Sequence, residues 1–128
     1  MKTVIEKWHD TFEGGKQSNL ADLLADDVVF HSPVVHRPLE GKEITLMYLE
    51  SAGKVLNNGS FEYVREVVGE RDAVLEFVTE LDGIHVNGID MIRWNEQGKI
   101  IDFKVMVRPL KAIQSVHAMM GKQLDTVS

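Results

Sequence analysis

The sequence predicts an α+β domain in which helices lie on one face of a curved antiparallel sheet. Apolar residues recur at helical spacing in much of the first half of the chain, whereas residues 61–108 alternate between apolar and polar side chains. A further helical pattern follows Pro109. Helices gathered ahead of a long run of strands are typical of this fold class.

Two helices and one strand are expected before residue 33. Thr3 followed by Glu6 matches a capping box for a first helix, and Gly14-Gly15 is expected to end it. A short second helix fits residues 19–25, with Ser18 or Asn19 as its cap. Residues 28–32 then predict a strand, which Pro33 ends.

A third helix is expected after a loop marked by Pro38 and Gly41. It ends at Asn57-Asn58-Gly59. One face of this helix would carry the residues with helical spacing, which are Ile44, Met47, Tyr48, Ser51 and Val55.

Four strands and a closing helix complete the predicted order. Residues 61–68 and 73–81 form two strands joined by a turn at 69–72, and Asp82-Gly83 forms the next turn. The clearest signal is a hairpin, in which residues 88–94 and 99–108 flank a polar loop that ends at Gly98. After Pro109, a last amphipathic helix is indicated by Leu110, Ile113, Val116 and Met120.

Composition limits the class of protein. The 128 residues are 44% hydrophobic and contain no linker-like stretch, so one domain over residues 1–128 is expected. A formal net charge of -6 argues against nucleic acid or an anionic membrane as the main partner. No apolar run is long enough to span a membrane, no signal-peptide core follows Met1, and cysteine is absent, so we expect a cytoplasmic protein.

Asp90 is the strongest candidate for function. Alternation along the hairpin groups it with Gly88, Ile92 and Trp94, on the face that a sheet turns toward its core. A carboxylate in such a place is unfavourable unless it is paired, hydrogen-bonded or protonated. A purely structural alternative is that Asp90 accepts a hydrogen bond from the Trp8 indole or the Tyr48 hydroxyl and only fixes the shape of a pocket.

The order and spacing of several motifs resemble the nuclear transport factor 2-like (NTF2-like) superfamily, and within it the SnoaL-like and ketosteroid-isomerase-like proteins. The resemblance rests on residues 24–33 with Gly41-Lys42, and on Gly88-Ile89-Asp90 with Gly98-Lys99-Ile100. It implies a cone-shaped fold with a pocket between the helices and the concave face of the sheet, and a homodimer. It implies no single activity, since members include isomerases, cyclases, dehydratases, epoxide hydrolases and binding proteins.

The resemblance transfers to this chain only in part. Asp90 occupies the position of the protonated aspartic acid that ketosteroid isomerases use toward an oxyanion. The isomerase's general base falls on Ser32 and its tyrosine donor on Trp8, so a conventional steroid isomerase is not favoured. The arginine that epoxide hydrolases of this superfamily carry falls on Gly88.

A pocket lining is predicted from aromatic and neighbouring residues. Alternation turns His31 away from the face that carries Phe30 and Ser32, although a β-bulge would reverse this. No two histidines have a metal-ligand spacing, so no metal or other cofactor is expected, and His9 and His117 are expected to face solvent. Asp102 and Arg93 are expected on the outer face, where Asp102 is a candidate partner for Arg93. The predicted lining residues are Trp8, Phe12, Phe30, Ser32, Tyr48, Phe77, Phe103, Val105, His31 and His36.

Two functions from different classes follow. As an enzyme, the protein would bind a small apolar or polyketide-like carbonyl compound and use Asp90 in proton transfer, as a cofactor-free isomerase, cyclase or lyase. The alternative is a non-catalytic module that binds a similar ligand, or a dimeric interaction module.

Overall fold

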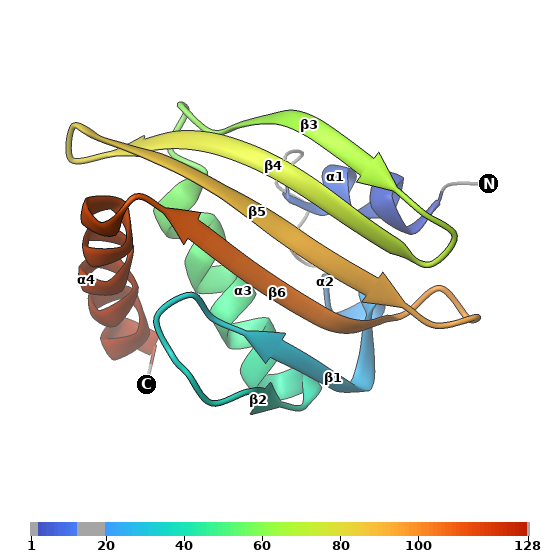
Figure 1. The fold of residues 1–128 in the computed structure, drawn as a ribbon. Helices are drawn as coiled ribbons and strands as arrows, with labels where there is room; N and C mark the ends of the chain where they lie inside the picture. Colours follow the sequence, from blue (N-terminus) through green and yellow to red (C-terminus); the bar gives the residue numbers. More distant parts are fainter. Residues whose placement is uncertain (1–2, 13–19, 128) are drawn as a thin grey trace.

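The computed structural model describes residues 3–12 and 20–127. It has the predicted α+β architecture, with helices on one side of a strongly curved six-stranded sheet (Figure 1). In chain order the elements are α1 (Val4–Phe12), α2 (Leu20–Leu23), β1 (Leu24–His31), β2 (Leu39–Glu40), α3 (Lys42–Leu56), β3 (Glu62–Val68), β4 (Asp72–Leu81), β5 (Ile84–Trp94), β6 (Ile100–Arg108) and α4 (Leu110–Val127).

The strands lie in the order β2-β1-β6-β5-β4-β3. Strands β3 to β6 form the predicted antiparallel run, in which each strand pairs with the next. Strand β1 pairs with β6 in parallel, and its last pair joins His31 to Lys104. Beyond that pair, β6 continues to Arg108 with β5 on one side and no β1 on the other.

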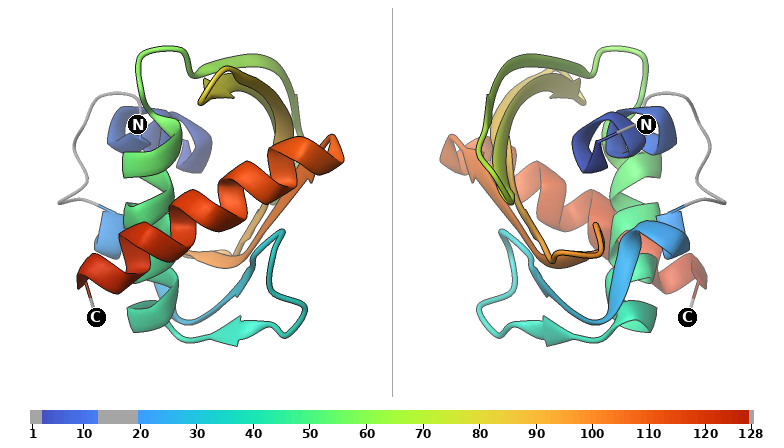
Figure 2. Two further views of the ribbon diagram at one scale, coloured as in Figure 1. Left: turned by 90° about the vertical axis from the view of Figure 1, so that its left-hand side faces the viewer. Right: turned by 90° about the vertical axis from the view of Figure 1, so that its right-hand side faces the viewer.

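Three helices cover the concave side of the sheet. Figure 2 shows the sheet curling around α3, with α1 beside the β3 end and α4 crossing in front of one end of the curve. The buried apolar residues lie between these helices and the inward faces of β4, β5 and β6. This arrangement turns the alternate residues Val86, Gly88, Asp90 and Ile92 of β5 toward the helices.

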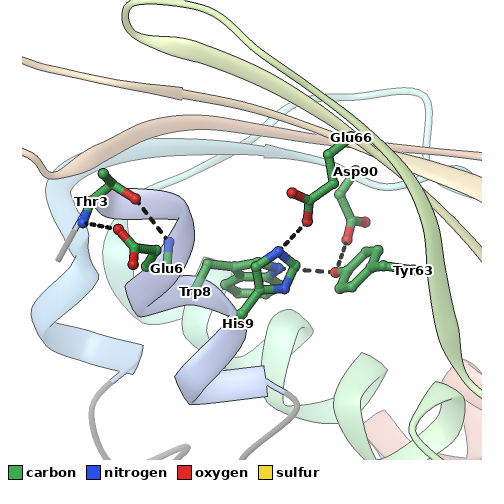
Figure 3. Close-up of polar contacts among 7 residues, drawn as sticks. All are labelled: Thr3, Glu6, Trp8, His9, Tyr63, Glu66 and Asp90. Carbon is green, nitrogen blue, oxygen red and sulfur yellow. Dashed lines mark hydrogen bonds and ion pairs between the residues drawn. The ribbon is translucent and has the colours of Figure 1, made fainter.

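The start of α1 is capped as predicted. The Glu6 amide donates to Thr3 Oγ1 at 3.2 Å, and the Thr3 amide donates to Glu6 Oε1 at 3.0 Å (Figure 3). This reciprocal pair satisfies two amide groups that the helix itself leaves unpaired. Gly14-Gly15 and the candidate caps Ser18 and Asn19 lie outside the described residues.

Three sequence-based details were wrong. The second helix ends at Leu23, and Leu24 and Ala25 already belong to β1, where they are buried. The two-residue strand β2 was missed because it is too short to show alternation, yet it pairs Leu39 with Phe30. In α3 the buried stripe is Thr45, Leu49, Gly53 and Leu56, so the helix is rotated from the predicted face, of which only Ser51 is buried.

Candidate functional site

Asp90 lies in the middle of β5 on the concave face of the sheet, as the alternation predicted. Its side chain is only 6% exposed. Its cross-strand partners are Leu75 on β4 and Val105 on β6. The carboxyl group therefore sits among apolar side chains at the centre of the sheet.

A chain of hydrogen bonds holds one oxygen of this carboxyl group. The Trp8 indole Nε1 donates to the Tyr63 hydroxyl at 2.9 Å, and that hydroxyl donates to Asp90 Oδ2 at 2.6 Å (Figure 3). The expected hydrogen bond to Asp90 directly from Trp8 or Tyr48 was wrong. Trp8 reaches the carboxyl only through Tyr63, and Tyr48 packs on Phe30 from α3.

The other carboxyl oxygen is available. Within residues 3–12 and 20–127, Asp90 Oδ1 has no hydrogen-bond partner, and Asp90 is among the residues that line an internal cavity. The one proton of the Tyr63 hydroxyl is already donated to Oδ2. A proton on the Asp90 carboxyl is therefore best placed on Oδ1, the oxygen that does not accept from Tyr63.

His9 lies beside Tyr63 (Figure 3). Its Nε2 pairs with Glu66 of β3, and its ring meets the Tyr63 ring edge-on at 5.1 Å between centroids. The expectation that His9 faces solvent was wrong. A bulge between Tyr63 and Arg65 shifts the alternation of β3 by one residue, so Glu66 rather than Arg65 turns toward α1.

Burial dominates the ionisation of Asp90. Loss of solvent raises the pKa of its carboxyl from 3.8 to about 7. The hydrogen bond from Tyr63 and the charge of His9 lower the same pKa and only partly oppose the effect of burial. Near neutral pH, both the acid and the carboxylate are therefore populated, which is the condition under which a group can give or take a proton.

The cavity beside Asp90 is small and apolar. It has a volume of about 40 Å³, room for roughly three water-sized groups. Of the described residues that line it, Asp90 is the one with a titratable side chain. Predicted residues among the lining are Trp8, Phe12, Phe30, Ser32, Phe77, Phe103 and Val105, joined chiefly by Phe61, Leu49, Val107, Val116 and Met120.

A larger open groove lies next to this cavity. It has a volume of about 700 Å³, and it shares Ser32, Pro33, Val105 and Val107 with the cavity. The structure places His31 and His36 in the groove rather than the cavity. This follows for His31 from strand alternation, which turns it to the outer face, where its Nε2 lies 2.9 Å from Asp102.

On the outer face of the sheet, the expected pairing of Arg93 with Asp102 was wrong. Arg93 and Asp102 are cross-strand partners, but the Arg93 guanidinium bonds Asp72 on β4 at 2.9 Å instead. Asp102 is engaged by His31. Neither residue reaches the cavity, so neither adds to the chemistry of Asp90.

Tyr63 is the important residue that sequence reasoning missed. It was placed on a strand with Phe61, and its inward orientation follows from that alternation. Nothing in the sequence connects it to Asp90, which lies 27 residues later and two strands away. A tyrosine at an inward position of a strand was the available signal, because a buried phenol hydroxyl needs a hydrogen-bond partner.

The described part of the chain holds no obvious place for a metal. In residues 3–12 and 20–127, no three His, Asp or Glu side chains converge closely enough to ligate an ion. In the same residues, no helix combines the length and apolar character needed to cross a bilayer.

The chain matches one family model and many solved structures. A family model described as a SnoaL-like domain matches residues 5–103. The chain is similar to a structure described as a steroid delta-isomerase from Pseudomonas aeruginosa, with 35% identity, a TM-score of 0.91, and coverage of 97% of this chain and 90% of that chain.

Two further solved structures are similar to the chain. An uncharacterised bacterial protein with a cystatin-like fold from Silicibacter pomeroyi shares 29% identity, with a TM-score of 0.88 over 98% of this chain and 88% of that chain. An NTF2-like protein of unknown function from Mesorhizobium loti shares 18% identity, with a TM-score of 0.72 over 83% and 88%, and supports the fold alone. No curated protein matches the sequence.

Proposed function

This chain belongs to the SnoaL-like domain family, with the NTF2-like fold that its sequence predicted, and from that premise we propose that it binds a small apolar carbonyl compound at Asp90. The observation that carries the proposal is a buried carboxyl group that lines an apolar cavity and, among the described residues, has a hydrogen-bond partner on only one of its two oxygens. A protonated Asp90 would donate a hydrogen bond from Oδ1 to the carbonyl oxygen of the ligand.

This hydrogen bond would favour loss of a proton from the carbon next to the carbonyl. Negative charge then grows on the carbonyl oxygen, and a fixed donor in a site with little water stabilises that charge strongly. The Tyr63 hydroxyl supports this arrangement because it holds Oδ2 and so orients the carboxyl group. The proposed chemistry is therefore of the isomerase or cyclase type.

The similarity to the Pseudomonas aeruginosa protein, named as a steroid isomerase, agrees with that reaction type. The size of the cavity gives less support to a steroid as the ligand of this chain. A cavity of about 40 Å³ is far below the roughly 300–1,000 Å³ of pockets that enclose drug-sized ligands. A steroid would fit only with most of its length in the adjacent groove, so we propose a smaller carbonyl group at Asp90 itself.

A non-catalytic binding protein is the second candidate. The observation in its favour is that the described lining residues include no second titratable side chain beside Asp90. Ser32 offers only a hydroxyl, which is a poor base without a partner that takes its proton. A catalysed reaction would then need water or the ligand itself as the second acid–base group.

Hydrogen–deuterium exchange of acetophenone in D₂O separates the two candidates. The wild-type protein is expected to accelerate exchange at the carbon beside the carbonyl, and Asp90→Asn is expected to reduce that catalysis by about 100-fold or more, because general acid–base groups contribute on that scale. Proton NMR follows the exchange and also reports ligand binding.

The matched control is Asp102→Asn, which removes a carboxylate from the outer face of β6. It is expected to leave exchange unchanged. Binding without exchange would establish the non-catalytic candidate, and absence of binding by the wild-type protein would contradict the proposed site.

We also propose that two copies of the chain pair through the outer face of the sheet. Val67, Val74 and Met91 form one cross-strand row there, and Val67 is 63% exposed. The paired charges Arg65 and Glu76 lie beside this row, so a two-fold axis can set opposite charges against each other.

The expected result for this pairing is a dimer in sedimentation velocity. Val67→Lys is expected to convert it to a monomer, since it would bury a charge at the centre of the interface. Lys54→Gln, on the exposed side of α3, is the control and is expected to leave the dimer intact. A monomeric wild-type protein at micromolar concentration would contradict the pairing.

A further inference from the structure

The groove outside the cavity lies where the sheet is locally incomplete. Strand β1 ends at His31, opposite Lys104, whereas β6 continues through Val105, Met106 and Val107. Over these residues, no strand from residues 3–12 or 20–127 pairs with the edge of β6 that faces away from β5. The loop after β1 and the first turns of α4 form the other walls, through Val34, Val35, His36, Ile113, Gln114 and His117.

This groove adjoins the cavity beside Asp90 and shares four lining residues with it. Val105 is the cross-strand partner of Asp90, and its side chain lines both spaces. A ligand whose carbonyl group reached Asp90 would pass Val105 on its way. Because the cavity itself has room for only about three water-sized groups, the rest of such a ligand would lie in the groove.

The charge of the groove differs from that of the whole chain. The chain carries 20 acidic and 14 basic residues, yet the described residues that line the groove include Lys104 and three histidines and no aspartate or glutamate. His31 is partly balanced by Asp102 just outside the lining. Lys104, His36 and His117 remain as the basic side chains that line the groove.

We propose that this groove binds an anionic group on the ligand whose carbonyl end reaches Asp90. The inference rests on the proposed function of Asp90 and narrows its substrate class to amphipathic keto acids and related anions. The apolar middle of the ligand would lie against Val105 and Val107, its carbonyl in the cavity, and its carboxylate or equivalent anion beside Lys104.

The test compares two ligands that differ only in charge. They are 6-oxoheptanoate and its neutral carboxamide, which have nearly the same size and the same methyl ketone, small enough for the cavity. Calorimetric titration of the wild-type protein is expected to show that the carboxylate binds about fivefold more tightly than the amide, in line with one or two solvent-exposed ion pairs. This preference is expected to shrink as salt is added.

Two variants test whether Lys104 in the groove causes the preference for the carboxylate over the amide. Lys104→Met keeps the aliphatic length of the side chain and is expected to reduce the carboxylate-to-amide ratio to about one. Lys7→Met, on the exposed side of α1 away from the groove, is expected to keep the wild-type ratio. Circular dichroism of both variants checks that they are folded like the wild type.

The outcomes separate this inference from the proposal on which it rests. Equal binding of both compounds, with affinity that depends on Asp90, would overturn the anion site and leave the proposed function intact. A carboxylate preference that survives Lys104→Met and the double change His36→Gln and His117→Gln would also overturn it. Failure of both compounds to bind the wild-type protein would overturn the two proposals together.

Discussion

Replacing Asp90 by Asn is expected to stabilise the protein at about pH 8 and to change its stability little at about pH 4. The reason is that the folded protein raises the pKa of this carboxyl to about 7, compared with 3.8 for the same group in water. The fold therefore favours the protonated acid and disfavours the carboxylate. Asn resembles the protonated acid in shape and lacks the charge.

The direction and size of this change in the free energy of unfolding follow from proton linkage. Between about pH 4 and 7, the folded protein keeps a proton that the unfolded chain has lost, so stability falls as pH rises through this range. The contribution is fully present below about pH 4 and is gone above about pH 7. A difference of about three pKa units corresponds to about 4 kcal/mol in the free energy of unfolding.

Urea denaturation of both proteins across this pH range measures the effect. The difference between variant and wild type is the relevant quantity, because other titrating groups contribute equally to both. Asp27→Asn, which removes an exposed carboxylate from β1, controls for the change in net charge. Parallel pH profiles for wild type and Asp90→Asn would contradict the account.

Tyr63→Phe is a second variant for the same urea denaturation experiment. It keeps the Asp90 carboxyl group and changes its pKa. It removes the hydroxyl that donates to Asp90 Oδ2, a hydrogen bond that lowers the pKa of Asp90. The pKa of Asp90 is therefore expected to rise further. The pH-dependent loss of stability would then extend to a higher pH than in the wild-type protein.

Gly88→Ala is expected to destabilise the fold by about 3 kcal/mol, a typical value for an overpacked core. A methyl group at Gly88 would lie 2.5 Å from Phe77 Cζ and 2.6 Å from the Met106 carbonyl oxygen. Phe77 is fully buried, and the carbonyl belongs to the backbone of β6, so neither can move away easily. Two neighbouring strands would have to separate.

Thermal unfolding and urea denaturation measure this loss. The matched control is Gly121→Ala in α4, where an added methyl group meets nothing within 4 Å and the helix gains about 1 kcal/mol. Gly88→Ala is also expected to weaken acetophenone binding, because Phe77 lines the cavity. A Gly88→Ala protein as stable as the wild type would show that this packing is not required.

The sequence predicted the parts of the site that depend on local periodicity. Strand alternation placed Asp90 on the concave face and His31 on the outer face, and the structure agrees for both. The capping box at Thr3 and Glu6 is another local pattern, and it was also predicted correctly. Each of these features is decided by residues within a few positions of one another.

The parts that were missed depend on register between distant segments. Tyr63 meets Asp90 because β3 and β5 both pair with β4 in a particular register. Glu66 meets His9 because a single bulge reverses the alternation of β3 after Tyr63. The separation of cavity from groove depends on where β1 ends relative to β6, and no local pattern specifies that pairing.

The central claim is that Asp90 is a buried acid that carries a proton near neutral pH. A ¹³C NMR titration of side-chain carboxyl groups tests it most directly, with Asp90→Asn to assign the signal. The account predicts that the Asp90 carboxyl titrates with a pKa of about 7. A pKa near the ordinary value of about 4 would mean a solvated or well-paired carboxylate, and would contradict the proposed role of Asp90.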